Sequence, residues 1–319
     1  FGVANFSFVE RTSLDLEALK SGILEALDGR RFSSFRIDAK RGDKGFPLTS
    51  PEINREIGAA VKETTGARVD LKNAECTISI EILPRDAFFG FDKIAGPGGL
   101  PVGASGRAVS LISGGIDSPV ASYRMMQRGC RLIFVHFHSA PYLDKSSQEK
   151  VRELVKLLTR HQFTSRLYLV PFGEIQRQIV AAVMRPLRVV LYRRMMMRIA
   201  EAIAKKEKAS ALVTGESLAQ VASQTLENLV VIEKAATLSI LRPLVGMDKQ
   251  EIIDQARRIG TFETSCIPDQ DCCQLFVPRH PATKARLADV EEAESRLDLA
   301  GLIQLRVEKA EMEEFSFPS

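Results

Sequence analysis

The sequence has no run of about 20 consecutive apolar residues, so it predicts no membrane-spanning helix. Its first residues, FGVANFSFVERTSLDLE, also lack the basic stretch, apolar core and small-residue cleavage site of a secretory signal. A cytoplasmic protein is therefore expected. Cysteine is sparse, and five cysteines in that compartment do not predict a disulfide framework. They are Cys76, Cys130, Cys266, Cys272 and Cys273.

Glycine and proline gather in residues 92–106, DKIAGPGGLPVGASG, and a domain boundary is expected there. The residues before this linker have the helical spacing and the alternation of a small α+β domain. The expected elements are a helix at 14–27, a strand at 35–40, a helix from the N-cap Ser50 to about Thr64, and strands at 69–71 and 77–83.

After the linker, short apolar runs alternate with helical patterns, which favours a doubly wound parallel sheet in an α/β fold. Strands are expected at 109–112, 132–137, 167–170 and 211–214, and helices at 118–128, 146–160 and 188–206. Ligands bind such sheets at the carboxyl ends of the strands. Three polar loops follow strands at that edge, at residues 113–118, 136–139 and 214–216. The tail from about Pro281 is charged and expected to be partly helical.

The loop Ser113-Gly114-Gly115-Ile116-Asp117-Ser118 has the composition of a phosphate cradle. Its two glycines let the backbone approach an anion, and the helix that follows presents its N–H groups and positive dipole end. Asp117 would repel phosphates unless a cation lay between them, which argues for Mg²⁺ held by that residue. The sequence contains neither a P-loop (GxxxxGK[ST]) nor a GxGxxG loop. A glycine-rich turn without a ligand is the alternative interpretation.

The pattern SGGxDS resembles the signature of the PP-loop ATP pyrophosphatases, also called adenine nucleotide α-hydrolase-like enzymes. Three longer strings resemble the ThiI family of tRNA 4-thiouridine synthetases: GLPVGASGRAVSLISGGIDSPVASYRMMQRG, YRRMMMRIAEAIAKKEKASALVTGESLAQVASQTLENL and LRPLVGMDKQEIIDQARRIGT. The family usually has glycine where this chain has Ala219. The resemblance implies an ATP-dependent tRNA sulfurtransferase that adenylates C4 of uridine 8, releases pyrophosphate and transfers persulfide sulfur. It also implies a second role, supplying sulfur for the thiamine thiazole.

The first domain also carries a resemblance, because FSSFRIDAKRGDKGFPLTSPEINREIGAAV is similar to the THUMP domain, an RNA-binding module. The expected layout is the end of a ferredoxin-like segment plus THUMP at 1–95, a linker at 96–106, the PP-loop domain at 107–280 and a helical tail at 281–319. The abrupt start suggests that an N-terminal segment is missing and that the first residues lack their partner element. Basic residues cluster at Arg36, Lys40, Arg41 and Lys44, where tRNA phosphates are expected to bind, although a plain solvated face is the alternative.

The ThiI resemblance implies roles for individual residues. The implied ATP-binding residues are Leu111, Ile112, Ser113, Gly114, Gly115, Ser118, His136, Phe137, Arg193, Gly215 and Gln224. Phe137 would offer an apolar face to the base, Arg193 would neutralise phosphate charge, and Gln224 would donate and accept hydrogen bonds. Phe137 as a core residue and His136 as a strand-end histidine are the structural alternatives.

The string Pro268-Asp269-Gln270-Asp271-Cys272-Cys273 resembles the family's segment around its essential cysteine, which makes Cys273 the implied sulfur carrier. Cys266 is the preferred partner for a disulfide, because adjacent cysteines pair only in a strained ring. Many family members carry a rhodanese domain, for which this chain has no room. A separate persulfide donor, such as a cysteine desulfurase, is therefore expected. An iron–sulfur cluster on three cysteines is the alternative, which the lack of a CxxC pair disfavours.

Two other functions remain open at this stage. One is a PP-loop ligase of the amidotransferase type, which the cysteines and the THUMP resemblance argue against. The other is a non-catalytic RNA-binding protein that retains ATP, against which the intact Ser113, Asp117 and Ser118 argue. A homodimer that binds tRNA is the assembly that the family resemblance implies.

Overall fold

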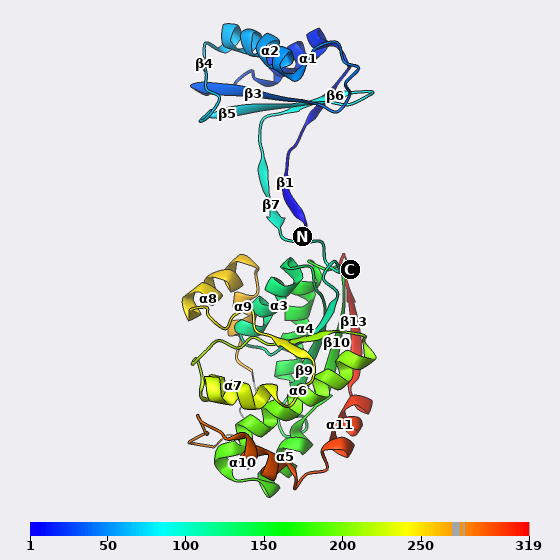
Figure 1. The fold of residues 1–319 in the computed structure, drawn as a ribbon, viewed down its shortest axis with the longest axis vertical. Coiled ribbons are helices and arrows are strands. Elements are labelled where there is room, and N and C mark those ends of the chain that lie inside the picture. The colour runs from blue at the N-terminus through cyan, green and yellow to red at the C-terminus, as the bar shows by residue number, and fades with distance from the viewer. Residues whose placement is uncertain (270–274, 277, 319) are drawn as a thin grey trace. The chain divides into compact units, whose positions relative to one another are not determined.

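The computed structural model describes residues 1–269, 275–276 and 278–318. The chain forms two compact units, one made of Val3–Gly98 and the other of Phe1–Gly2 with Gly99–Ser319 (Figure 1). None of the described helices is long and apolar enough to cross a membrane.

The smaller unit is a two-layer α+β fold. Its elements are β1 (Val3–Phe6), β2 (Glu10–Thr12), α1 (Leu16–Ala26), β3 (Ser34–Arg41), α2 (Ser50–Thr65), β4 (Arg68–Val69), β5 (Cys76–Ile82), β6 (Ala87–Gly90) and β7 (Ile94–Gly98). A five-stranded sheet has the order β2-β6-β5-β3-β4. Both helices cover one face of this sheet (Figure 1), and Leu19, Ile23, Ile53 and Ile57 pack from them onto Phe35 and Ile78. Neither helix of this unit covers the other face.

Two sequence expectations about this unit are wrong. The first residues do have a partner, because β1 pairs antiparallel with β7, a strand that lies inside the expected linker. The N-cap of α2 is Thr49 rather than Ser50, since the Glu52 carboxylate accepts hydrogen bonds from the backbone N–H and the hydroxyl of Thr49, both at 2.7 Å. This capping box fixes the start of the helix one residue earlier than proline and serine alone suggest.

The larger unit is an α/β sandwich around a six-stranded sheet. Its elements are β8 (Arg107–Leu111), α3 (Asp117–Gln127), β9 (Arg131–His138), α4 (Ser146–Thr159), β10 (Thr164–Pro171), α5 (Gly173–Ala182), η1 (Arg185–Leu187), α6 (Arg188–Lys206), β11 (Ala211–Val213), η2 (Ala222–Gln224), α7 (Leu226–Glu233), β12 (Ser239–Leu241), α8 (Lys249–Arg258), α9 (Phe262–Cys266), α10 (Leu287–Glu294), α11 (Leu299–Glu308) and β13 (Glu311–Ser316). The strand order is β12-β11-β8-β9-β10-β13.

Helices cover both faces of this sheet, as the doubly wound fold requires (Figure 1). One core lies between the sheet and α3, α4 and α8, with Val120, Leu154 and Ile252 buried in it. The second core lies on the opposite face, where α5, α6, α7, α10 and α11 pack. The strands β8 to β12 run parallel, and the predicted fold class is confirmed. Their carboxyl ends therefore meet at one edge, where ligands bind in such folds.

The tail is partly helical as expected, with α10 and α11, but it ends in the unexpected strand β13, which pairs antiparallel with β10 at the edge of the sheet. Its sequence, EMEEFS, carries three glutamates and only two large apolar residues, so it does not show the regular alternation that predicts a strand. Two of these charges meet arginines of the neighbouring elements: Arg152 pairs with Glu313 at 2.8 Å and Arg166 with Glu314 at 3.0 Å. Strand formation thus depends on partners more than 140 residues away in the sequence.

Candidate active site

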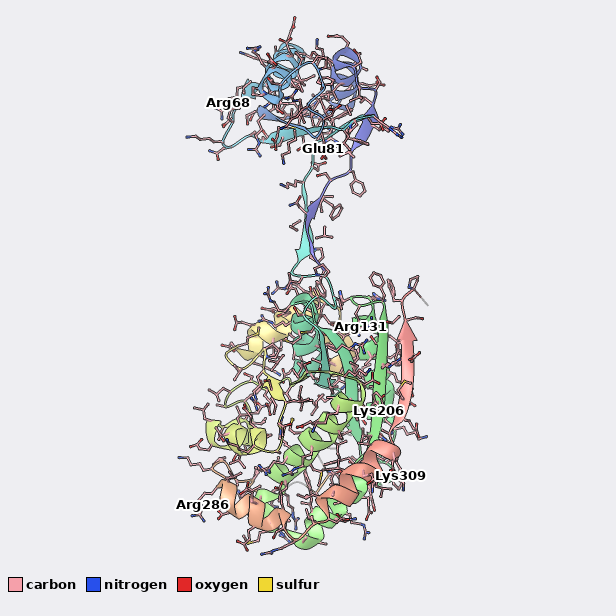
Figure 2. The ribbon with its side chains drawn as sticks, turned by 45° about the vertical axis from the view of Figure 1, so that its right-hand side comes forward. Arg68, Glu81, Arg131, Lys206, Arg286 and Lys309 are labelled. Carbon is pink, nitrogen blue, oxygen red and sulfur yellow. The ribbon has the colours of Figure 1, made fainter. Side chains whose placement is uncertain are left out.

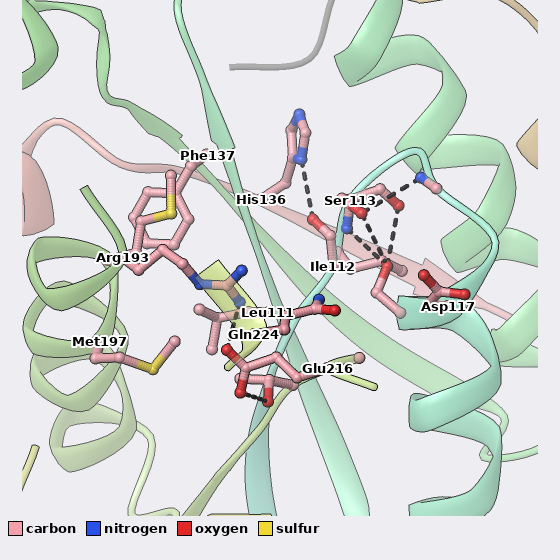
Figure 3. Close-up of a pocket in the computed structure, with 15 residues that line it drawn as sticks. Leu111, Ile112, Ser113, Asp117, His136, Phe137, Arg193, Met197, Glu216 and Gln224 are labelled. Atoms are coloured by element: carbon pink, nitrogen blue, oxygen red, sulfur yellow. Dashed lines mark hydrogen bonds and ion pairs between the residues drawn. The ribbon is translucent and has the colours of Figure 1, made fainter. Parts of the chain in front are cut away.

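A pocket of about 190 Å³ lies in the larger unit, where the loops after β8, β9 and β11 meet (Figure 3). Of the residues expected to contact a nucleotide, all but Gly114 line it, and Asp117 lines it too. Met196, Met197, Thr214 and Glu216 complete the wall. The structure therefore brings together residues from 111 to 224 that the sequence resemblance grouped.

The loop at residues 113–118 is held in shape by its own serines. The Ser118 hydroxyl oxygen accepts a hydrogen bond from the Ser113 backbone N–H at 2.9 Å, and the two hydroxyls lie 3.2 Å apart. Helix α3 begins at Asp117 without a side-chain cap, and its first two residues line the pocket. Unpaired N–H groups and the helix dipole together favour an anion at this end.

Asp117 already has a cation beside it. Lys249, the first residue of α8, places its Nζ 2.7 Å from one oxygen of the Asp117 carboxylate, and Gln220 donates to the other at 3.0 Å. The Lys249 ammonium thus offsets the charge of this carboxylate. In the described part of the chain, no three His, Cys, Asp or Glu side chains group as a metal site. One carboxylate fits only a Mg²⁺ that takes most of its ligands from phosphates and water.

Glu216 is the buried centre of a charge cluster at the base of the pocket. Its side chain is 1% exposed and pairs with Arg193 at 2.5 Å and Arg242 at 2.7 Å, while Thr214 donates to it at 2.9 Å. Burial raises the pKa of Glu216, but the two guanidinium charges and their hydrogen bonds outweigh burial and hold that pKa below its ordinary value. Glu216 therefore stays ionised and fixes the direction of Arg193.

Two polar atoms in the pocket wall are buried without a hydrogen-bond partner among the described residues. They are Nε of Arg193, a donor, and Oε1 of Gln224, an acceptor. Such orphaned groups cost free energy unless a ligand or water satisfies them. A small molecule with both hydroxyl donors and acceptors, such as a nucleotide, would satisfy both.

His136 and Phe137 serve the structure as well as the pocket wall. The buried imidazole of His136 hydrogen-bonds the Ile112 carbonyl oxygen through Nδ1 at 3.0 Å, which ties β9 to the start of the loop after β8 (Figure 3). Phe137 packs edge-on against Phe172 with ring centroids 5.4 Å apart. Each side chain thus contacts another part of the protein and also lines the pocket.

Gly215 lies where the loop after β11 crosses the start of α3. A Cβ at this position would lie 2.7 Å from the Ser118 backbone nitrogen and 2.9 Å from the Asp117 carbonyl carbon. Only glycine allows this approach of two backbones. The same loop provides Thr214 and Glu216 to the charge cluster.

The structure describes three of the five cysteines. Cys272 and Cys273 lie outside the described residues, and so does any pairing of Cys273 with Cys266. Cys266 is exposed at the end of α9. Cys130 is buried and free, and burial raises its pKa, as is typical of a cysteine that packs in the core.

The basic residues of the smaller unit do not form a uniform patch. Arg36, Asp38 and Lys40 alternate along β3 and line one surface hollow, and Glu81, labelled in Figure 2, lies opposite Lys40 on β5 and lines the same hollow. Arg41 donates to the Phe46 carbonyl oxygen at 3.0 Å. Lys44 is exposed. Their role in RNA binding stays a prediction.

Sequence reasoning assigned no role to the charged residues in and around the pocket and the phosphate loop: Glu216, Arg242, Lys249, Lys150 and Asp269. Arg242 follows β12, the strand next to β11, and Lys249 begins the helix after it. Had β12 been recognised in the sequence as a parallel neighbour of β11, Arg242 would have been predicted at the same edge of the sheet. Nothing local marks Lys249 as the partner of a residue 132 positions earlier.

Comparison with known proteins assigns both units. Residues 103–299 match the family described as thiamine biosynthesis protein (ThiI), and residues 14–92 match the THUMP domain. A probable tRNA sulfurtransferase of Thermus thermophilus is 54% identical over 99% of this chain and 78% of its own length, and one of Moorella thermoacetica is 48% identical over 98% and 80%. A crystal structure of a 4-thiouridine synthetase–RNA complex with bound ATP matches 99% of this chain and 84% of its own, at 37% identity and a TM-score of 0.91.

Proposed function

The chain belongs to the ThiI family, and on that premise we propose that it is a tRNA sulfurtransferase that uses ATP to make 4-thiouridine. The observation that carries this proposal is the pocket at the phosphate loop, whose orphaned donor and acceptor call for a polar ligand of nucleotide type. A structural relative of this chain, a 4-thiouridine synthetase, has ATP and RNA bound.

In the proposed first half-reaction, the C4 oxygen of a tRNA uridine attacks the α-phosphorus of ATP. A new oxygen–phosphorus bond forms, the N3 proton of the uracil passes to water, the bond from the α-phosphorus to the bridging oxygen breaks, and pyrophosphate leaves. The N–H groups at the start of α3 and the Ser113 and Ser118 hydroxyls would hold the phosphates. Mg²⁺, if bound, would be held by Asp117 and would offset phosphate charge. Arg193 and Gln224 would contact the nucleotide.

In the second half-reaction, the terminal sulfur of a cysteine persulfide attacks C4 of the adenylated uracil and AMP leaves with the former C4 oxygen. A cysteine thiolate then attacks the inner sulfur, so the sulfur–sulfur bond breaks, the base keeps C=S and a protein disulfide forms. An external thiol must reduce that disulfide before the next turnover. We propose Cys273 as the carrier and Cys266 as the second thiol, with a cysteine desulfurase as the source of persulfide.

Further details belong to the same proposal. The smaller unit would bind tRNA, with uridine 8 as the target base flipped from its stack so that the pocket can reach C4. A homodimer would allow one copy to present tRNA to the other. Sulfur supply for thiamine is proposed as a second role, in line with the description of the family.

The proposal is tested with unmodified tRNA, ATP and a persulfide donor, by following pyrophosphate release and the absorbance of 4-thiouridine. Pyrophosphate release that depends on tRNA, together with 4-thiouridine, is the expected result. Cys273→Ser should retain pyrophosphate release and lose thiolation, with Cys272→Ser as the matched comparison. ATP binding without any tRNA-dependent pyrophosphate would favour the non-catalytic RNA-binding alternative. Pyrophosphate formed with ammonia and a small carbonyl acceptor instead would favour the ligase.

A further inference from the structure

The last described residues before Cys272 and Cys273 run directly against the phosphate loop. At the end of α9, the Ser265 hydroxyl donates to the Gly115 carbonyl oxygen at 3.4 Å. Three residues after Cys266, the Asp269 side chain packs on Gly114 so closely that a Cβ there would overlap its carboxylate. Gly114 does not line the pocket, and its lack of a side chain is what lets this segment lie on the back of the loop.

Lys150 binds this segment at two points. It extends from α4, and its side chain is only 5% exposed. The ammonium donates to the Ile267 carbonyl oxygen at 2.6 Å and lies 3.3 Å from one oxygen of Asp269. One buried cation therefore fixes both the backbone at residue 267 and the carboxylate at residue 269.

The charge of Asp269 bears on the loop that it touches. Its Oδ2 is buried and has no hydrogen-bond partner among the described residues, and its side chain is 13% exposed. A carboxylate so poorly solvated next to a loop that must accept phosphates would repel them through a medium of low dielectric. Lys150 cancels that charge, so the pair as a whole presents no net charge to an anion in the loop.

We propose that Lys150 is a positioning residue that couples the nucleotide loop to the cysteine-bearing segment, an inference that rests on the proposed function. It acts in two separable ways. By neutralising Asp269 it keeps the loop receptive to the phosphates of ATP. By holding the Ile267 carbonyl and Asp269 it fixes the start of the segment that leads to Cys272 and Cys273, and so the approach of sulfur to the activated base.

The two effects are separated by Lys150→Met, Asp269→Asn and the double variant, with ATP affinity measured by equilibrium binding without tRNA. Lys150→Met should weaken ATP binding about tenfold, because the Asp269 charge is left uncompensated. The double variant should bind ATP within about threefold of wild type, since no unpaired charge remains. Asp269→Asn alone should bind ATP at least as well as wild type.

Sulfur transfer should respond differently. At saturating ATP, pyrophosphate release by the double variant should stay within about threefold of wild type, while 4-thiouridine formation should remain about tenfold lower, because the Ile267 carbonyl has lost its donor. Lys156→Met is the matched control on the same helix, since Lys156 is 56% exposed and pairs only with the neighbouring Glu153 among the described residues. This variant should match wild type in both assays.

Several results would overturn the inference. Equal ATP affinity of Lys150→Met and the double variant would refute the charge argument, as would a tenfold loss in Asp269→Asn. Full thiolation by the double variant would refute the positioning argument. Melting curves show whether each variant folds. If Lys150→Met does not fold, comparison of Asp269→Asn and the double variant with wild type decides between these outcomes. If wild type binds ATP but makes no 4-thiouridine, the proposed function fails, while the affinity comparison still tests Lys150.

Discussion

Replacing Gly215 by alanine tests whether the crossing of two backbones at the pocket is essential. The added Cβ would meet the Ser118 nitrogen at 2.7 Å, the Ser118 Cα at 2.8 Å and the Asp117 carbonyl carbon at 2.9 Å. Favourable carbon contacts lie at about 3.5–4.0 Å, so relief requires a shift of about 1 Å. All three atoms belong to backbone, which cannot rotate out of the way.

Overpacking of this kind costs about 1–3 kcal/mol. The strain falls on the first turn of α3 and on Ser118, whose hydroxyl holds the shape of the phosphate loop. A change of 1.4 kcal/mol shifts an equilibrium tenfold, so ATP affinity should fall about tenfold if about 1.4 kcal/mol of the strain is expressed on binding. The measurements are urea unfolding and ATP titration of the variant.

Gly246 provides the matched control for this substitution. A Cβ at Gly246 would meet nothing within 4 Å, and the residue lies in the turn between β12 and α8 of the same unit. Gly246→Ala should therefore change stability by less than about 0.5 kcal/mol and leave ATP binding unchanged. If Gly215→Ala behaved like this control, the close approach of the two loops would not matter for binding.

Three more substitutions test buried charge. Glu216→Gln should cost about 3 kcal/mol of unfolding free energy, because Arg193 loses its counter-charge and Arg242 keeps only the exposed Glu233; a loss below 1 kcal/mol would contradict this. Glu294→Gln should destabilise more than Arg194→Met in urea unfolding, since the second change leaves Glu294 paired with Arg198 at 2.6 Å; the reverse order would refute the argument. Burial, with the nearby charge of His136, lowers the pKa of His138 from 6.5 to about 4. The unfolded chain then binds more protons between these values, so stability should fall as pH drops from about 6.5 to about 4, and His138→Asn should flatten that slope.

The part of the site that residue chemistry predicted without any family resemblance is encoded in contiguous residues. Ser113 to Ser118 form one loop, and their spacing already specifies two glycines, a hydroxyl pair and a helix start. The strand and helix pattern around them places that loop at the ligand-binding edge of a parallel sheet. Local chemistry was enough because each contact within the loop spans five residues or fewer.

The parts that the sequence could not predict depend on distant partners. Lys249 reaches Asp117 across 132 residues, and Lys150 reaches the Ile267 carbonyl across 117. Neither lysine differs locally from any solvated lysine on a helix. The strand β13 is similar, since its acidic side chains become strand residues only against arginines of α4 and β10. Which charged residues pair across such long separations in the sequence depends on the tertiary structure, and local sequence patterns do not reveal it.

The basic residues of the smaller unit show that residues close together in the sequence can also be mispredicted, because the fold decides which charges surround them. Residues 1–106 contain 14 Lys and Arg against 15 Asp and Glu, yet Arg36, Lys40, Arg41 and Lys44 lie close together in the sequence. In the folded sheet, alternation places Arg36 and Lys40 on one face, but it places Asp38 between them and the pairing with β5 brings Glu81 alongside. A cluster in sequence thus becomes a mixed surface in space. General electrostatic attraction of RNA to a surface requires an excess of positive charge, which this face of the sheet does not have. Any tRNA binding by this face must therefore depend on individual side chains that contact particular phosphates or bases.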